Sequence, residues 1–324
     1  MQVIQDAFHA GDLPRGGVAA IGNFDGIHRG QRSIIERVVE RARELGRPAL
    51  ALTFEPHPLG VLRPGEAPPP RLTTPEEKRR LLEEAGVEHL LVIRFDEELA
   101  ATPAEAFVRG FLAGRLGVAA LRVGPGFTFG HRREGDLTLL ERLGEELGFD
   151  ARAVEEVTYR GERISSTRIR RAVAEGRIED ANEMLGRPYS LWGTVARGDR
   201  MGKRLGWPTI NLTPESELIP ADGVYAGRVF FPAFPAAFVC ATNIGTRPTV
   251  YENFQRVVES HILDFATDVY GERVEIRFHK RLREERMFAT VMDLSAQIGR
   301  DVEATREYFA ARRHLEEPAA SGDR

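Results

Sequence analysis

The first half of the chain alternates short apolar runs with amphipathic stretches. GVAAIG at 17–22 and ALALTF at 49–54 are almost wholly apolar, and between them apolar residues recur at helical spacing from Ile34 to Leu45. A strand, a helix and a second strand in this order form a βαβ unit. Strands that are apolar on both faces predict a parallel sheet covered on both sides.

The same alternation continues as far as residue 147. Thr74 is followed by Pro75 and Glu77, a pattern typical of a helix N-cap, a first-turn proline and a capping-box acid. This helix is expected to end near Ala85. The other expected elements of this half are a strand at 90–93, a helix at 103–114, a strand at 120–124 and a helix at 137–147. Together they predict a doubly wound, Rossmann-like parallel sheet.

The pattern changes after residue 186. Two short helices are expected just before this point, at 167–175 and 178–185. Strand-like runs, separated by turns rich in Gly, Pro and Asp, then follow at 191–198, 223–231, 238–245, 256–265 and 272–279. Because no helix is expected between these runs, they predict a mostly antiparallel sheet or a small β-barrel.

A final helix is expected at 295–312, with Ile298, Val302 and Phe309 on one side and charged residues on the other. The fold class is therefore α/β followed by β, with a terminal helix. We expect a first domain at 1–186, a second at 187–313 and a disordered tail at 314–324.

Composition limits the class of protein. The 324 residues include 45 Lys and Arg against 49 Asp and Glu, for a net charge of −4, which argues against a polycation that coats nucleic acid. Cys240 is the only cysteine, so an intrachain disulfide and a cysteine metal cluster are excluded, and buried packing is expected. The N-terminal residues lack the apolar region of a secretory signal, and no apolar run is long enough to span a membrane. We expect a cytoplasmic protein without nucleic-acid or membrane partners.

The turn between the first expected strand and helix, GNFDGIHRGQ at 22–31, is the first candidate site. An open α/β sheet places ligands at the carboxyl ends of its strands, beside helix N-termini that favour phosphate. Gly22, Gly26 and Gly30 permit close approach of the backbone, and His28 can donate a hydrogen bond to phosphate. The spacing does not match a dinucleotide fingerprint. An ordinary turn with a surface histidine explains this stretch equally well.

Two more segments of the first half carry candidate ligands. ISSTRIR at 164–170 gathers hydroxyl and guanidinium groups at a helix start, where an anion binds or where a plain N-cap is followed by solvated arginines. GFTFG at 126–130 follows the strand at 120–124. Phe127 and Phe129 are placed to line a flat apolar site, although core packing is the commoner role of such residues.

In the second half, the loop from Gly198 to Asn211 holds three glycines, two arginines and a lysine. It is not a P-loop, because the spacing between its glycines is one residue short and Arg204 stands where a hydroxyl would bind Mg²⁺. A backbone cradle for phosphate and a solvated basic hairpin both fit. Thr209 and Asn211 supply the hard oxygen ligands that suit Mg²⁺ carrying nucleotide phosphates.

Two further segments follow. NIGTRPT at 243–249 is expected to be a turn at the end of a strand. Strand alternation in the next run places Glu259, His261 and Leu263 on one face. A single acid in an apolar strand is a candidate general base, or else an exposed charge at an edge.

Together these segments resemble the family of bacterial bifunctional riboflavin kinase/FMN adenylyltransferases, also called FAD synthetases. The resemblance runs from about residue 15 to 312. It is carried by GNFDGIHRG, FEPHP at 54–58, GFTFG, ISSTRIR, GKRLGWPTIN, NIGTRPT and VESHILDF. It implies a first domain that transfers AMP from ATP to FMN with release of pyrophosphate, and a second, barrel domain that phosphorylates riboflavin with ATP.

The resemblance also implies roles for individual residues. His28 and Glu259 are the expected catalytic residues, with Glu259 deprotonating the terminal ribityl hydroxyl that attacks the γ-phosphate. Thr209 and Asn211 are the expected Mg²⁺ ligands. Flavin contacts are expected from Phe54, Pro56, Phe127 and Phe129. Contacts to ATP or phosphate are expected from Gly22, Phe24, Asp25, Gly30, Gln31, Ser165, Ser166, Thr167, Arg168, Gly202, Lys203, Arg204 and Asn211.

In the first half, two positions depart from the family pattern; in the second half, the usual PTAN sequence reads PTIN at 208–211. Gln31 stands where the family's HxGH turn ends in a second histidine, and Gly126 stands where the aromatic loop begins with an acid or an amide. A glutamine cannot become a cation, so stabilisation of the adenylylation transition state should weaken. This leaves two alternatives: a riboflavin kinase whose adenylyltransferase domain is weak or inactive, and a non-catalytic flavin- or nucleotide-binding protein.

Overall fold

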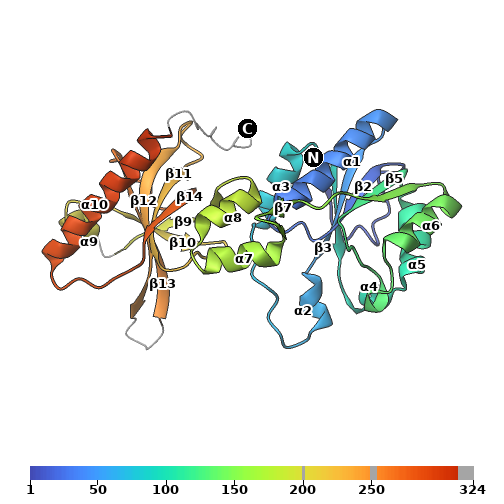
Figure 1. The fold of residues 1–324 in the computed structure, drawn as a ribbon, viewed down its shortest axis with the longest axis horizontal. Coiled ribbons are helices and arrows are strands. Elements are labelled where there is room, and N and C mark those ends of the chain that lie inside the picture. The colour runs from blue at the N-terminus through green and yellow to red at the C-terminus, as the bar shows by residue number, and fades with distance from the viewer. Residues whose placement is uncertain (199–200, 249–253, 313–324) are drawn as a thin grey trace. The chain divides into compact units, whose positions relative to one another are not determined.

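The computed structural model describes residues 1–198, 201–248 and 254–312, which form two compact units that meet in the sequence between Ser166 and Thr167 (Figure 1). The helices α7 (Ser166–Ala174) and α8 (Ile178–Leu185) thus belong almost entirely to the second unit, and α8 packs against strands of that unit. The expected boundary between residues 186 and 187 stays a prediction. The expected tail at 314–324 lies outside the described residues.

The first unit is built on a six-stranded sheet in which every strand pair is parallel. The strand order is β1-β4-β3-β2-β5-β6, so the chain leaves β2 toward β3 on one side and later returns to β5 on the other. This confirms the doubly wound, Rossmann-like sheet. The strands are β1 (Gln2–Ile4), β2 (Val18–Ile21), β3 (Ala49–Glu55), β4 (His89–Arg94), β5 (Ala120–Val123) and β6 (Asp150–Ala153).

Helices cover both faces of this sheet, as its apolar strands predict (Figure 1). Successive residues of β2 face opposite ways: Val18 packs with residues of α1 (Arg29–Leu45), whereas Ala19 packs with the helical segments at 104–115 and α6 (Leu137–Leu147). The other helices are α2 (Pro58–Leu62), α3 (Pro75–Glu84), α4 (Glu97–Ala101) and α5 (Ala104–Ala106), which a π-helix continues over Phe107–Arg115. The Thr74 side chain accepts a hydrogen bond from the Glu77 amide at 3.1 Å, which confirms the expected N-cap of α3.

The second unit is a closed antiparallel barrel with the strand order β10-β13-β12-β11-β14-β9 and a long terminal helix, α10 (Val291–Ala310), packed against β11 and β12 (Figure 1). This confirms the expected barrel. Its strands are β9 (Tyr189–Ala196), β10 (Ile210–Pro214), β11 (Gly223–Phe230), β12 (Phe238–Pro248), β13 (Phe254–Ile262) and β14 (Arg273–Arg283). The short elements are a hairpin in the first unit, β7 (Thr158–Tyr159) with β8 (Glu162–Arg163), and the helix α9 (Met201–Arg204).

Three local expectations for this unit were wrong. Asn211 lies in β10 rather than in a loop, because residues 210–214 pair on both sides, with β9 and with β13. Asn243 lies inside β12, which pairs with β13 as far as Pro248, so the expected turn is a strand. The terminal helix begins four residues earlier than expected because Thr290 caps it, accepting a hydrogen bond from the Asp293 amide.

The barrel interior is filled by alternate residues of its strands. On β13, Val258 and Ser260 are buried, and the Ser260 hydroxyl lies 2.8 Å from that of Thr242 on β12, so two buried hydroxyls satisfy each other. Cys240 is fully buried beside them, and desolvation raises the pKa of its thiol to about 12. The thiol is therefore a packing group, as expected, and not a nucleophile.

His279 is a partly buried histidine on β14 that makes the stability of the barrel sensitive to acid. Its ring centroid lies 5.0 Å from that of Phe309 on α10. Burial, helped by the nearby guanidinium groups of Arg228, Arg277 and Arg312, lowers the pKa of His279 to about 4.

We predict that this imidazole destabilises the barrel at acid pH. The unfolded chain binds a proton at His279 below its ordinary pKa of 6.5, whereas the folded chain binds it only below about 4. The free energy of unfolding therefore has its full value above pH 6.5. It decreases as the pH falls, by about 2 kcal/mol at pH 5. Urea unfolding followed by tryptophan fluorescence measures this, since both tryptophans, Trp192 and Trp207, lie in the barrel unit. A His279→Leu variant that lost as much stability between pH 7.5 and pH 5 would contradict the assignment.

Candidate active sites

The loop from Gly22 to His28 joins β2 to α1 at the point where the strand order reverses. This is the position at which open α/β sheets bind their ligands. Two non-glycine residues of the loop, Phe24 (φ 45°) and Ile27 (φ 39°), adopt left-handed backbone conformations. Strain of this kind persists where the surroundings hold it, and Phe24 is almost fully buried with its ring against Gly22. The loop is held in one conformation by its own core residues.

His28 caps the helix that follows this loop. Its Nδ1 accepts a hydrogen bond from the Gln31 amide at 3.2 Å, and the Gln31 side-chain oxygen accepts one from the His28 amide at 3.3 Å. Because Nδ1 acts as an acceptor, the neutral ring carries its proton on Nε2 and presents that atom as a donor. Gln31, which departs from the family pattern, thus completes a capping box that orients His28.

Asp25 is buried, and its carboxylate holds the loop in place by accepting backbone hydrogen bonds. Its Oδ1 accepts hydrogen bonds from the amides of Leu72 at 2.9 Å and Thr73 at 3.4 Å. The Thr73 hydroxyl in turn accepts one from the Gly26 amide at 3.3 Å. Asp25 therefore ties the loop to the segment before α3. Its expected contact with ATP stays a prediction.

The ISSTRIR segment meets this loop although it lies far away in the sequence. The Ser166 hydroxyl donates a hydrogen bond to the backbone oxygen of Asp25 at 2.8 Å. A Cβ atom at Gly30 would lie 3.4 Å from the His28 ring and 4.0 Å from the Ile164 carbonyl oxygen, so the two segments approach each other closely here. Two of the expected phosphate-binding segments are thereby brought together. Thr167 and Arg168 are the next residues of α7 and belong to the second unit.

Lys78 is a residue of this site that sequence reasoning missed. Its ammonium group donates a hydrogen bond at 2.9 Å to the backbone oxygen of Asn23, which also accepts one from the Thr53 hydroxyl at 3.1 Å. Burial lowers the pKa of Lys78, against the opposing effect of the carboxylates of Asp25 and Glu55. The Lys78 side chain thus supports the loop through its hydrogen bond to the backbone at Asn23. No sequence signal marks it, because it reads as one of several charges on an amphipathic helix.

The expected flavin-contacting aromatics lie at the edge of the core. The rings of Phe127 and Phe129 are stacked with centroids 5.5 Å apart, and Phe54 packs edge-on against Phe95. Phe54, Phe127 and Phe129 are partly buried against the same core cluster, whereas Pro56 is exposed. Their packing role is therefore visible, and their flavin contact stays a prediction.

The second departure from the family pattern has a backbone explanation. Gly126 adopts φ +69°, a left-handed conformation that a glycine enters at no steric cost, and a side chain placed there would lie 3.7 Å from an Arg163 guanidinium nitrogen.

In the barrel unit, three polar residues line up across three neighbouring strands. Asn211 on β10 is the register partner of Glu259 on β13, which is in turn the partner of Asn243 on β12. Residues next to them, such as Val258 and Ile244, are fully buried inside the barrel. The side chains of Asn211, Glu259 and Asn243, which we call the polar row, therefore point to the outer face of the barrel.

Gly198 and Gly202 allow the backbone of the loop before β10 to lie against the polar row. A side chain at Gly198 would overlap the Asn211 amide. One at Gly202 would overlap the Trp207 backbone oxygen and lie 3.0 Å from the Thr209 hydroxyl. The loop backbone therefore lies directly against the two expected Mg²⁺ ligands. Arg204 is exposed at the end of α9, and the side chain of Lys203 lies outside the described part of the chain.

Trp207 connects this loop to α10. Its Nε1 donates a hydrogen bond to the Ser295 hydroxyl at 3.1 Å, and its ring packs against Gly299. On its other side the ring meets His261 edge-on, and His261 Nδ1 donates a hydrogen bond to the Pro208 backbone oxygen at 2.8 Å. The residues that precede Thr209 are thus held between α10 and β13.

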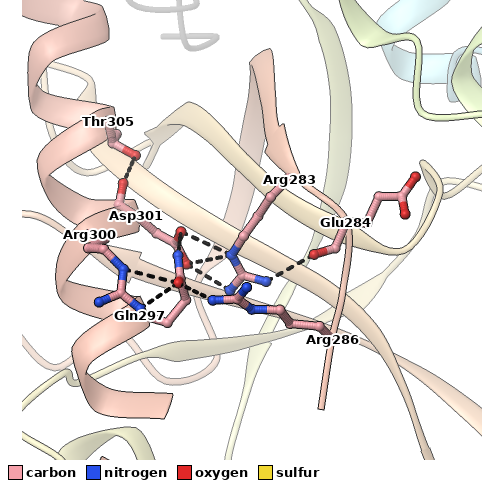
Figure 2. Close-up of polar contacts among 7 residues, drawn as sticks. All are labelled: Arg283, Glu284, Arg286, Gln297, Arg300, Asp301 and Thr305. Carbon is pink, nitrogen blue, oxygen red and sulfur yellow. Dashed lines mark hydrogen bonds and ion pairs between the residues drawn. The ribbon is translucent and has the colours of Figure 1, made fainter. Parts of the chain in front are cut away.

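A polar network around the buried side chains of Gln297 and Asp301 fastens the end of β14 to α10, as Figure 2 shows. The Arg283 guanidinium makes a bidentate contact with the Asp301 carboxylate, with nitrogen–oxygen distances of 2.7 and 3.0 Å. Gln297 donates to the same carboxylate at 2.8 Å, while its oxygen accepts from Arg286 and Arg300. Because planar bidentate pairs fix geometry, this network sets where the chain leaves β14.

The expected oxygen ligands are of the chemical type that Mg²⁺ prefers. No group of three or more His, Cys, Asp or Glu side chains is arranged to hold a metal ion within the described ranges. A Thr hydroxyl, an Asn amide oxygen and a nearby carboxylate form a hard oxygen donor set, which Mg²⁺ uses together with substrate phosphates and water.

Comparisons with known proteins give matches to both halves of the chain. Residues 12–168 match the family model described as FAD synthetase, and residues 185–309 match the one described as riboflavin kinase. The chain is 40% identical to the bifunctional riboflavin kinase/FMN adenylyltransferase of Escherichia coli (strain K12), over 95% of this chain and 98% of the relative. It is 38% identical to the protein of the same description from Pseudomonas fluorescens, over 97% of this chain and all of the relative.

One solved structure resembles nearly the whole chain. It is described as a macrolide-efflux protein from Streptococcus pneumoniae and matches with a TM-score of 0.85 and 28% identity, over 94% of this chain and 99% of that one. In the described ranges of the present chain, no helix combines the length and apolar character needed to cross a membrane.

Proposed function

Because the chain belongs to the family of bifunctional riboflavin kinase/FMN adenylyltransferases, we propose that the polar row and the β2–α1 loop carry its two reactions. The protein phosphorylates riboflavin to FMN and adenylylates FMN to FAD, with ATP as the second substrate of both reactions. The alternatives of a weakened first half and of a non-catalytic binder are not favoured. We place both reactions in the cytoplasm, with small molecules as the partners.

The kinase reaction is proposed to use the polar row. Glu259 accepts the proton of the terminal ribityl hydroxyl as that oxygen attacks the γ-phosphorus of ATP, and ADP leaves. Thr209 and Asn211 would hold Mg²⁺ together with the ATP phosphates, and the ion would neutralise charge that develops on them. The observation that carries this proposal is the direct pairing of Asn211 with Glu259 across β10 and β13. It places the expected base beside an expected ligand of Mg-ATP.

The adenylylation reaction is proposed to use the loop after β2. The FMN phosphate attacks the α-phosphorus of ATP and pyrophosphate leaves, so no covalent enzyme intermediate is needed. His28 donates a hydrogen bond from Nε2 to the phosphates, and the α1 N-terminus adds the positive end of its helix dipole. Ser165, Ser166, Thr167 and Arg168 are proposed to hold the triphosphate. The capping box supports this role, because it fixes the ring of His28.

We predict that Asn211→Ala raises the Mg²⁺ requirement of riboflavin phosphorylation. Removing an oxygen ligand should increase the Mg²⁺ concentration for half-maximal FMN formation by about tenfold or more. Chromatography of products from riboflavin and ATP over a Mg²⁺ titration measures this. FAD formation from supplied FMN, assayed in the same preparation, should match that of the wild-type protein.

The matched control is Thr213→Ala, an exposed residue two positions along the same face of β10. It should leave the Mg²⁺ titration unchanged. An unchanged titration in Asn211→Ala would instead remove Asn211 from the proposed metal ligands.

A further inference from the structure

Asn243 occupies a place in the polar row that the expected chemistry has not used. It is the register partner of Glu259 on the side opposite Asn211. Directly opposed residues of antiparallel strands have Cβ atoms about 5 Å apart, so an asparagine amide is within reach of the neighbouring carboxylate. The carboxylate proposed as the base therefore stands between two amides.

The surroundings of Asn243 set it apart from an ordinary outward-facing polar residue. Two positions before it on the same face, Ala241 is buried in a cluster with Val302 and Ile298 of α10. Two positions after it, Gly245 lies directly beneath the Glu285 carboxylate, where any side chain would overlap. Asn243 itself is partly buried between Ala241 and Gly245.

The barrel does not need this amide to satisfy its interior. The buried hydroxyls nearest to it, Thr242 and Ser260, are hydrogen-bonded to each other at 2.8 Å. The network that fastens α10 to β14 uses Arg283, Asp301 and Gln297 instead (Figure 2). An apolar residue would cover the outer face of β12 as well as Asn243 does, as Val239 and Ala241 do on the same strand.

We propose that Asn243 is a positioning residue for riboflavin phosphorylation, with its amide N–H holding the Glu259 carboxylate in line with the ribityl hydroxyl. This inference rests on the proposed role of Glu259. A neutral amide suits the task, because it donates a hydrogen bond without neutralising the base as a lysine or arginine would. An aspartate at this position would have the same shape but no donor, and it would place a second negative charge opposite the first.

The test is a set of variants of the full chain, assayed for both activities. Asn243→Leu and Asn243→Asp should lower the kcat of FMN formation by about 10- to 100-fold, because the base loses its alignment. The KM values for riboflavin and ATP should stay within about threefold, since neither substrate loses a direct contact. Asn243→Gln, which keeps the amide donor, should recover most of the lost kcat.

Two controls separate this role from a loss of structure. Adenylylation of supplied FMN reports the state of the same preparation, and Thr213→Leu makes a similar change at an exposed position of the outer face. Wild-type kcat in Asn243→Asp, or a failure of Asn243→Gln to exceed Asn243→Leu, would overturn the proposal. The role of Glu259 is tested separately by its own variants. If Glu259→Gln failed to phosphorylate riboflavin while Asn243→Leu remained fully active, the role of Asn243 would be refuted and that of Glu259 would stand.

Discussion

Glu259→Gln should abolish most riboflavin phosphorylation while FMN adenylylation continues. The amide has nearly the shape of the carboxylate but cannot accept the hydroxyl proton, so the kcat of FMN formation should fall by about 10²- to 10⁴-fold. KM for ATP should change little, because Thr209 and Asn211 remain. Product chromatography after incubation with riboflavin and Mg-ATP measures the first step, and incubation with FMN and Mg-ATP measures the second.

The variant Glu259→Asp is the matched control for charge. It keeps a base but withdraws the base by one methylene, so its rate should lie between those of the wild-type protein and Glu259→Gln. Equal FMN formation by Glu259→Gln and the wild-type protein would leave the kinase without an assigned base. In that case the pairing of Asn211 with Glu259 would contribute to the structure of the barrel but not to catalysis.

The opposite separation of activities is expected from His28→Asn. Asparagine is among the best N-cap residues, so its side-chain oxygen can still accept from the Gln31 amide and α1 can still begin at the same place. The Nε2 donor is lost, and FAD formation from FMN should fall by about 10²- to 10³-fold, as for other groups that stabilise developing charge. FMN formation from riboflavin should stay at the wild-type rate.

Gln31→Ala distinguishes the cap from the catalytic donor. It removes the hydrogen bond that the His28 amide donates to the Gln31 side-chain oxygen but leaves the imidazole in place. We expect a loss of adenylylation of less than about tenfold, because a helix cap contributes about 1 kcal/mol. If His28→Asn and Gln31→Ala lowered FAD formation equally, His28 would act as a cap and not as a ligand of the phosphates.

Much of the fold follows from local patterns. The apolar runs at 17–22 and 49–54 become β2 and β3 because each residue of such a run can be buried on one face of the sheet or the other. Thr74 and Pro75 start α3 because they satisfy the exposed amides of its first turn. The motifs after β2 and at 164–170 could also be recognised, since each is a contiguous stretch with a distinctive composition.

Two of the wrong expectations concern elements that depend on partners distant in the sequence. β10 is only five residues long and ends at Pro214, so its alternation of polar and apolar residues is too short to distinguish it from a loop. It is a strand because β9 and β13 pair with it on both sides. The strand expected at 238–245 was to end in a turn at 243–249, because NIGTRPT contains turn-forming residues, yet pairing with β13 keeps the chain extended as far as Pro248.

The amino-acid sequence alone determined the fold class of both halves and the residue types of the two sites. Burial patterns and helix caps act between near neighbours, so they are visible in a linear string. Only the tertiary structure decided that Asn243 stands opposite Glu259, that Lys78 supports the loop after β2 and that His28 and Gln31 form a reciprocal cap. The first two arrangements depend on contacts between residues far apart in the chain, and the third depends on side-chain geometry, neither of which a residue pattern records.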